Sequence, residues 1–198
     1  MLTTPASRPL ARATQLGTTL LEVLVTIVIL TIGLLGLAGL QGQTLVAELE
    51  SFQRAQAILL MNDMVERIAA NRPEAASYVT AQPLGTGSTA TAACSTTPTT
   101  QVGLDQCDWG YALLGSSEKK SGNRVGGVVN GVGCVELVTA QNNAAGVCTP
   151  GVYRVTVAWQ GSNLTSIPSV TCGTGAYGDE RYRRAISSKV SIGLPSCQ

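Results

Sequence analysis

The chain has 198 residues, a formal net charge of +1 and no histidine. A nearly neutral chain produces no overall field that favours nucleic acid, so no direct nucleic-acid binding is predicted. The lack of imidazole excludes Ser-His-Asp and Cys-His nucleophile pairs and the HExxH zinc site. We therefore expect one domain, with room for an appended segment, that is not an enzyme and holds no cofactor or metal.

The first 17 residues form a basic leader without an acidic residue or an apolar run, and they include Arg8 and Arg12. From Val23 to Leu40 the chain is uncharged, which is nearly long enough for a helix to span a bilayer. The preceding positive charges predict a cytoplasmic leader and an exported C-terminal part. Because no small-residue cleavage site follows Leu40, the apolar run is expected to stay in the mature protein.

Gly17 directly precedes this run, and Glu22 lies within it. An unpaired carboxylate is costly in lipid, so Glu22 either lies close enough to the interface to stay hydrated or pairs with a cation. Cleavage after Gly17 would supply a cation, because the new ammonium on Thr18 would lie one helical turn away. It could neutralise Glu22 of its own chain or of a neighbouring subunit.

The segment G-T-T-L-L-E-V-L-V, starting at Gly17, resembles the class III leader of type IV prepilins and pseudopilins. The resemblance implies that a prepilin peptidase cuts after Gly17 and methylates the new N-terminus at Thr18. It also implies that Glu22 guides subunit assembly. That family usually has a large apolar residue after the cut, where this chain has Thr18.

Three glycines, Gly33, Gly36 and Gly39, recur at every third position of the apolar run. They fit a close helix–helix approach, or a segment that melts locally when the subunit leaves the membrane. They equally fit the ordinary glycine enrichment of membrane helices. The sequence does not choose between these interpretations.

After Leu40 the pattern becomes amphipathic without a break, and Pro73 predicts that the helix ends at Asn71. A helix from Thr18 to Asn71 would be roughly 80 Å long. Its second half is predicted to pack one apolar stripe against a globular head. This stripe consists of Leu45, Leu49, Phe52, Leu59, Met64 and Ile68.

The segment N-D-M-V-E-R-I-A-A-N-R at 62–72 resembles the corresponding region of minor pilins of the PilV type, as does the apolar segment ending at Gln41. These matches cover about the first third of the chain. Four charged residues of this region are interpreted physically as a solvated helix face with i,i+3 and i,i+4 pairs. They are Asp63, Glu66, Arg67 and Arg72.

The rest of the chain predicts a β-rich head. Residues 83–103 are rich in Pro, Gly, Ser and Thr and predict a long loop, and residues 108–114 predict a short helix or turn. The predicted strands are two short ones within Val125–Val138, around an Asn-Gly turn, and two longer ones at Val152–Trp159 and Tyr182–Ile192. Their alternation predicts an α+β chain in which a helix backs an antiparallel sheet, and the resemblance implies the type IV pilin fold.

All six cysteines lie in the C-terminal half, and no two form a CxxC pair. This pattern predicts three disulfides in an oxidising compartment rather than redox or metal chemistry. The sequence does not choose the pairing, although Cys94 is expected to tie the loop to the head. The cysteines are Cys94, Cys107, Cys134, Cys148, Cys172 and Cys197.

Residues 179–184 (D-E-R-Y-R-R) form the only marked charge cluster. Its three arginines and Tyr182 could contact a partner pilin, DNA or a surface. Alternatively, mixed charges at a strand entrance are a solvated edge that discourages further strand pairing.

The predicted organisation has four parts: a cytoplasmic leader at 1–17, a membrane or filament-core helix at 18–42, an amphipathic helix at 43–72 and a periplasmic head at 73–198. The resemblance implies a minor type IV pilin that takes part in pilus assembly and priming, at the pilus tip. Its partners would be other minor and major pilins, the prepilin peptidase, the inner-membrane assembly platform and the lipid bilayer. It would cross the inner membrane once and then enter the cell-surface pilus.

Two alternatives stay open. A minor pseudopilin of a type II secretion system would carry the same leader. A membrane-anchored hydrolase would need serine with lysine as base, but no S-x-x-K motif lies on a predicted helix.

Overall fold

The computed structural model describes residues 19–88, 94, 98–116, 119–121, 123–124, 126–142, 144 and 146–193. The chain divides into two compact units, Met1–Leu45 and Val46–Gln198, and each is described by itself. Gly17, Thr18 and Cys197, which carry predictions from the sequence, lie outside the described residues.

The first unit contains the beginning of helix α1, which runs from Leu20 to Ala70. Thr19 precedes the helix, and its hydroxyl accepts a hydrogen bond of 3.4 Å from the backbone N–H of Glu22. The same N–H also donates to the Thr19 carbonyl at 3.0 Å. Threonine at a helix N-terminus with glutamate three residues later is a capping-box sequence. Local hydrogen bonding therefore explains why the helix begins here.

The apolar part of α1 presents its side chains to the surroundings. Leu20, Ile29 and Leu35 are examples, with 82%, 64% and 72% of their surface exposed. The hydroxyls of Thr26 and Thr31 donate to carbonyls three residues earlier, each at 2.8 Å, so these polar groups need no partner outside the helix. Among the described residues, α1 is the one helix that is long and apolar enough to cross a membrane.

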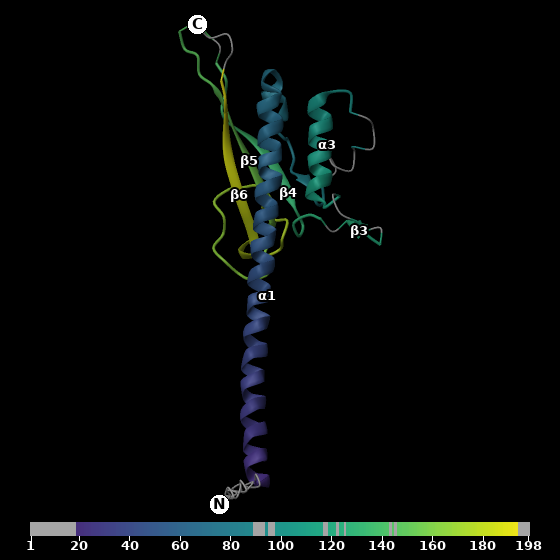
Figure 1. Ribbon diagram of the computed structural model, residues 1–198. Helices are drawn as coiled ribbons and strands as arrows, with labels where there is room; N and C mark the ends of the chain where they lie inside the picture. Colours follow the sequence, from purple (N-terminus) through teal and green to yellow (C-terminus); the bar gives the residue numbers. More distant parts are fainter. Residues whose placement is uncertain are drawn as a thin grey trace, which may run out of the picture. The chain divides into compact units, whose positions relative to one another are not determined.

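The second unit is built on a four-stranded antiparallel sheet with the order β1-β4-β5-β6 (Figure 1). A separate two-stranded ribbon pairs β2 with β3. The strands are β1 (Leu84–Gly85), β2 (Lys119–Lys120), β3 (Asn123–Arg124), β4 (Val132–Thr139), β5 (Gly151–Gln160) and β6 (Arg183–Ile192). The helical elements besides α1 are η1 (Arg72–Tyr78), α3 (Gln101–Leu113) and η3 (Glu180–Tyr182). The predicted α+β architecture is confirmed.

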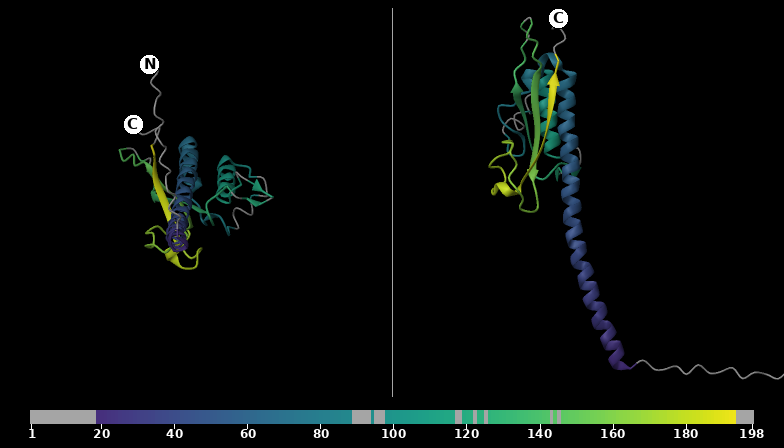
Figure 2. Two further views of the ribbon diagram at one scale, coloured as in Figure 1. Left: turned by 60° about the horizontal axis from the view of Figure 1, so that its bottom comes forward. Right: turned by 90° about the vertical axis from the view of Figure 1, so that its left-hand side faces the viewer.

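The main core lies between the sheet and two helices, the part of α1 after Val46 and α3 (Figures 1 and 2). The alternation predicted in β5 is confirmed, because Tyr153, Val155, Val157 and Trp159 all point into this core and are at most 5% exposed. Each fully buried side chain of this size contributes about 1.5–3 kcal/mol. The sheet and the helices therefore stabilise each other through one shared apolar layer.

Close packing of α3 on the sheet depends on Gly133 of β4. The Trp109 ring lies directly against this glycine, so that a Cβ there would clash with the ring and with Leu113. The Trp109 indole N–H donates to the Leu60 carbonyl of α1 at 2.7 Å. One tryptophan thus joins α3 to both the sheet and the long helix.

The stripe by which α1 packs differs from the predicted one. Met64 and Ile68 are fully buried as predicted, and Ala57 and Met61 complete their stripe at helical spacing. The other predicted members within this unit do not pack on the sheet and are more than half exposed. They are Leu49, Phe52 and Leu59, with exposures of 57%, 59% and 63%. The buried stripe and these exposed residues lie on different sides of the helix, because successive residues are rotated by about 100° about its axis.

Two further predictions are corrected. Residues 126–131, within the predicted hairpin Val125–Val138, form no strand, and β4 pairs with β1 and β5 instead. The reason is local, because the Gly126 N–H donates to the Gly115 carbonyl at 3.2 Å, which keeps this segment against the end of α3. The helix predicted at 108–114 is longer than expected and begins at Gln101, where the Thr100 hydroxyl accepts from the Gly103 N–H.

The opposite face of the sheet carries a second, smaller core. It contains Val132, Cys134, Ala158, Cys172 and Tyr177. The loop between β5 and β6 supplies the last two of these residues, and a disulfide joins Cys172 to Cys134 of β4. The middle of β5 is consequently covered on both faces.

Candidate assembly sites

The first candidate site is the start of α1. Glu22 lies in the first turn of the helix, after Thr19. A carboxylate there interacts favourably with the partial positive charge of the helix N-terminus. The charge of Glu22 therefore favours the start of the helix, an effect separate from assembly. The predicted role in assembly stays a prediction.

The second candidate site is an exposed apolar stripe on α1, formed by Leu49, Phe52 and Leu59. These residues recur at intervals of three and seven, so they share one side of the helix. Exposed apolar residues gathered on one surface typically mark a contact with protein or membrane. Within the second unit this stripe is left uncovered by the sheet and by α3.

Two of the four charged residues of the 62–72 segment, Asp63 and Arg67, join a contact network of the head. Glu66 and Arg72 are exposed, as the interpretation of a solvated face expects. Arg67 contacts Asp63 of the same helix at 3.0 Å and Asp105 of α3 at 3.1 Å. Asp105 is only 7% exposed, and it also accepts hydrogen bonds from Tyr78 and from Gln101. The predicted i,i+4 pair is present, whereas no pattern in the sequence indicated Asp105 as a partner of Arg67.

The electrostatics of this network follow from its partial burial. Burial raises the pKa of Tyr78, and its hydrogen bond to Asp105 raises it further. Burial lowers the pKa of Arg67, but the hydrogen bonds and charges of Asp63 and Asp105 outweigh that effect and raise it. Arg67 therefore stays protonated, and the network joins α1, η1 and α3 in one ionic contact.

The three arginines of the charge cluster at 179–184 form ion pairs within the head. Arg181 pairs with Asp179 at 2.6 Å, and Arg183 pairs with Glu180 at 2.6 Å. Arg183 is 3% exposed and also donates to three backbone carbonyls of the preceding loop, those of Pro168, Val170 and Cys172. The hydrogen bonds from Arg181 lower the pKa of Asp179 to about 2.

The third arginine of the cluster, Arg184, joins the loop to the long helix. Its guanidinium contacts Glu50 of α1 at 3.3 Å, the Thr165 hydroxyl at 2.6 Å and the Asn163 carbonyl at 2.7 Å. Glu50 also accepts from the Ser162 N–H at 3.1 Å. These contacts favour the structural interpretation of the cluster over a free basic patch.

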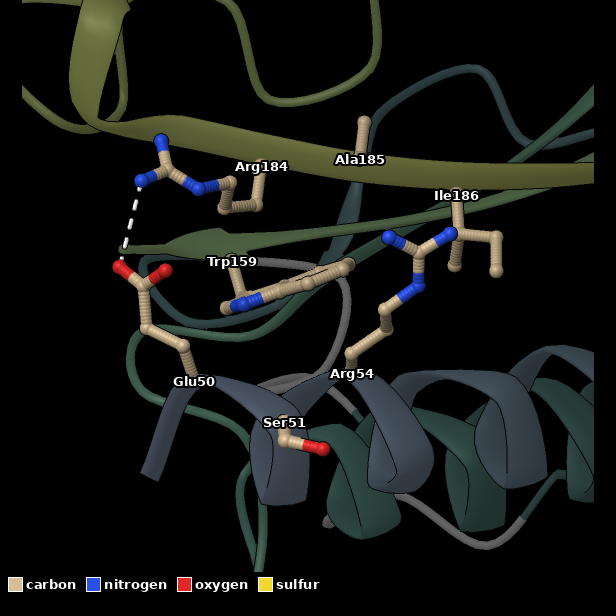
Figure 3. A pocket seen from close by; sticks show the side chains of 7 residues that line it. All are labelled: Glu50, Ser51, Arg54, Trp159, Arg184, Ala185 and Ile186. Atoms are coloured by element: carbon tan, nitrogen blue, oxygen red, sulfur yellow. Dashed lines mark hydrogen bonds and ion pairs between the residues drawn. The ribbon is translucent and has the colours of Figure 1, made fainter. Parts of the chain in front are cut away.

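The third candidate site is a hollow of about 350 Å³ beside this ion pair (Figure 3). Helix α1 provides Glu50, Ser51 and Arg54, and β6 provides Arg184 and Ile186. Trp159 of β5 lies opposite Arg184 in the strand pairing, and its ring forms the floor between Glu50 and Arg54 (Figure 3). The hollow is therefore lined by a large aromatic surface and by two cations.

The cysteines of the head form covalent ties. Cys94 pairs with Cys107 of α3, and Cys134 pairs with Cys172. Cys148 is also disulfide-bonded, and Cys197 lies outside the described residues. Cys94, which lies in the predicted loop, is thus tied to the head through α3. Among the residues that the structure describes, no three acidic or cysteine side chains gather to hold a metal ion.

The chain was compared with models of known protein families, with curated proteins and with solved structures. The model of the family "Type IV pilin Tt1218" matches residues 39–109. The chain is type IV pilin-like. The matched range contains the Asp63–Arg67–Asp105 network and ends at Trp109, so it coincides with the contacts that join α1 to α3. No curated protein and no solved structure matches the chain.

A type IV pilin-like chain accounts for the combination of features on these elements. One helix begins as an exposed apolar segment, and its later residues carry a small antiparallel sheet. The fold is the type IV pilin fold predicted from the sequence. Exposed apolar surfaces such as those of α1 typically mark contacts with lipid or with protein.

Proposed function

We propose that the chain is a minor type IV pilin of the PilV type. It is stored in the inner membrane through the apolar part of α1, with its head in the periplasm. A prepilin peptidase cuts it between Gly17 and Thr18 and methylates the new N-terminus. The mature subunit then joins other minor pilins and primes the pilus at its tip, and motility is a property of the whole fibre.

The uncovered apolar surface of α1 carries this proposal. The helix is apolar enough to reside in a membrane before assembly, and its exposed side chains need a new environment once it leaves. Packing against the helices of other subunits would supply that environment. The exposed stripe of Leu49, Phe52 and Leu59 would be a further contact surface, on the part of α1 that carries the head.

The head supports the proposal through its rigidity. Two disulfides and the Arg67–Asp105 contact tie its loops and helices to one scaffold. The chemistry of an enzyme is not needed for such a role, since a pilin works by packing. The head would present its loops to partners while α1 makes the longitudinal contacts.

The proposal is tested by following the chain into fibres. A deletion strain should assemble few or no pili, and re-expression should restore them. In the complemented strain, the chain should be present in sheared pili in small amounts relative to the major pilin. Normal piliation of the deletion strain, together with absence of the chain from sheared pili, would refute a role in the pilus.

The same strain separates the pilin from a pseudopilin. A minor pseudopilin would carry the same helix, but its loss would stop export of the substrates of a type II secretion system and leave piliation intact. We expect the opposite pattern, with secretion of exoproteins unchanged and pili lost.

A further inference from the structure

The hollow formed by Glu50, Arg54, Trp159, Arg184 and Ile186 lacks an acceptor for two of its hydrogen-bond donors. Arg54 makes no ion pair or hydrogen bond with any residue that the structure describes. Trp159 is 5% exposed, and its indole N–H likewise has no acceptor within the described part of the chain. Arg54 is exposed, and the Trp159 indole nitrogen is not among the buried polar atoms that lack a partner. Solvent therefore reaches both donors, and a ligand in the hollow would take its place.

The other charges around the hollow are already neutralised. Arg184 pairs with Glu50 at 3.3 Å, and it donates to Thr165, Arg181 and Asn163 as well. Glu50 also accepts from the Ser162 N–H. A ligand in the hollow would consequently meet one net positive charge, that of Arg54, together with an N–H donor.

The side chains that line the hollow also determine which chemical group fits into it. The Arg54 guanidinium extends from α1 toward β6, beside Ile186 and the edge of the Trp159 ring (Figure 3). A planar group with two acceptor oxygens fits a guanidinium by two parallel hydrogen bonds, and its carbon stem can rest on the aromatic and aliphatic surface. An aspartate or glutamate side chain has this form.

We propose that this hollow receives a carboxylate side chain from a neighbouring pilin-like subunit of the assembled fibre. The inference rests on the proposed function, because only assembly brings such a subunit to this face. Charge complementarity selects the occupant, since an acceptor-only anion pairs with Arg54 while the Glu50–Arg184 pair stays intact. Pairing of this kind sets the register of subunits in addition to affinity.

The test uses the Arg54→Lys variant of the full-length chain and treats its sheared fibres with a water-soluble carbodiimide. The reagent joins an amine and a carboxylate in contact into an amide, and it takes up the water as its urea. Mass spectrometry should find the introduced lysine linked to an aspartate or glutamate of another pilin-like subunit. The link should be absent from cells that lack the prepilin peptidase, because their subunits do not assemble.

Arg72→Lys is the matched control, since Arg72 lies beyond the same helix and outside the hollow. It should give no link at position 72 under the same conditions. A second variant, Arg54→Glu, should reduce the chain in sheared fibres by about tenfold, because like charges would then meet across the contact. Its head should unfold at the same urea concentration as the wild type, since Arg54 has no internal partner among the described residues.

The outcomes separate the inference from the function on which it rests. If the wild-type chain enters fibres but the lysine of Arg54→Lys forms no link to another subunit, and Arg54→Glu assembles normally, the hollow is not a subunit contact. A link from that lysine only to Glu50 of its own chain, or only to a protein that is not pilin-like, also overturns the inference. Absence of the wild-type chain from fibres overturns the proposed function and the inference together.

Discussion

Arg67 of α1 donates to Asp105 of α3 across 38 residues of sequence, with 3.1 Å between guanidinium nitrogen and carboxylate oxygen. Asp105 is nearly buried, so removing it leaves Tyr78 without its acceptor and Arg67 with a single close partner. We expect Asp105→Ala to lower the free energy of unfolding by about 1–3 kcal/mol. Urea unfolding of the detergent-purified chain, followed by tryptophan fluorescence, measures this loss.

Asp108→Ala is the control for that prediction. Asp108 lies 4.0 Å from Arg67, and its side chain is 69% exposed, so its loss should change stability by no more than about 0.5 kcal/mol. Equal effects of the two substitutions would mean that the Asp105 network contributes nothing special to the head.

The two described disulfides should contribute unequally. Cys134 and Cys172 are 38 residues apart, whereas Cys94 and Cys107 are 13 apart. In the chain-entropy model these loops correspond to about 4 and about 3 kcal/mol respectively. Cys134 and Cys172 are also buried in the second core, which adds to the difference.

We therefore expect the double variant Cys134→Ala/Cys172→Ala to unfold at a lower urea concentration than Cys94→Ala/Cys107→Ala. Both measurements use non-reducing conditions. The reverse order would show that strain or residual structure, and not loop closure, decides the contribution of each bond.

Stability should fall at alkaline pH because of three tyrosines. Burial raises the pKa of Tyr78, Tyr153 and Tyr177 above the ordinary value of 10.0. The unfolded chain therefore loses these protons first, and the stability that is fully present below pH 10 declines as the pH rises above it. The expected slope is at most about 1.4 kcal/mol per pH unit for each tyrosine.

Tyr177→Phe tests this assignment. It removes one of the three groups, so the decline of the urea midpoint between pH 10 and higher pH should become less steep than in the wild type. The variant also loses the hydrogen bond from the Tyr177 hydroxyl to the Asn130 carbonyl. Loss of this bond lowers the free energy of unfolding by a similar amount at each pH, so the change in slope reports only the loss of the titrating hydroxyl. An unchanged slope would show that Tyr177 does not stay protonated in the folded head.

Glu22 has two possible contributions, and two substitutions distinguish them. Glu22→Ala should spare membrane insertion and cleavage but reduce the chain in sheared fibres, because it removes both the charge and a side chain suited to the capping box. Glu22→Gln keeps a side chain that suits a capping box but not the charge. If pairing with an ammonium matters, Glu22→Gln should fail as Glu22→Ala does.

Thr19→Ala controls for the cap itself, since the Thr19 hydroxyl accepts from the Glu22 N–H. Losing a cap costs a helix about 1 kcal/mol, which is small for a helix of 51 residues. We expect Thr19→Ala to assemble normally. Full assembly of Glu22→Gln, with failure of Thr19→Ala, would assign Glu22 to helix capping instead of charge pairing.

Local patterns in the sequence predicted much of the fold. The alternation in β5 was sufficient to place Tyr153, Val155 and Val157 in the core, and the Pro73 signal placed the end of α1 within one residue. Helical spacing was less informative for α1, which has two apolar stripes. The predicted stripe combined Met64 and Ile68, which pack on the sheet, with exposed residues of the other stripe.

Contacts between residues far apart in the chain could not be predicted from the sequence. Nothing local marks Asp105 as the partner of Arg67, or Glu50 as the partner of Arg184, because each pair forms only when separate elements pack. The pairing of two cysteines across the second core likewise depends on the path of the loop between β5 and β6. Arg54 resembled many other surface charges, and only its position in the hollow distinguishes it.

The central claim is that this chain is a processed pilin subunit, and the mass of its mature N-terminus tests it most directly. The protein is purified from membranes of cells with and without a functional prepilin peptidase, and its N-terminal peptide is sequenced. We predict a chain that begins at Thr18, carries one added methyl group and appears only with the peptidase. A chain that keeps residues 1–17, or that is cut after Leu40, would contradict the account.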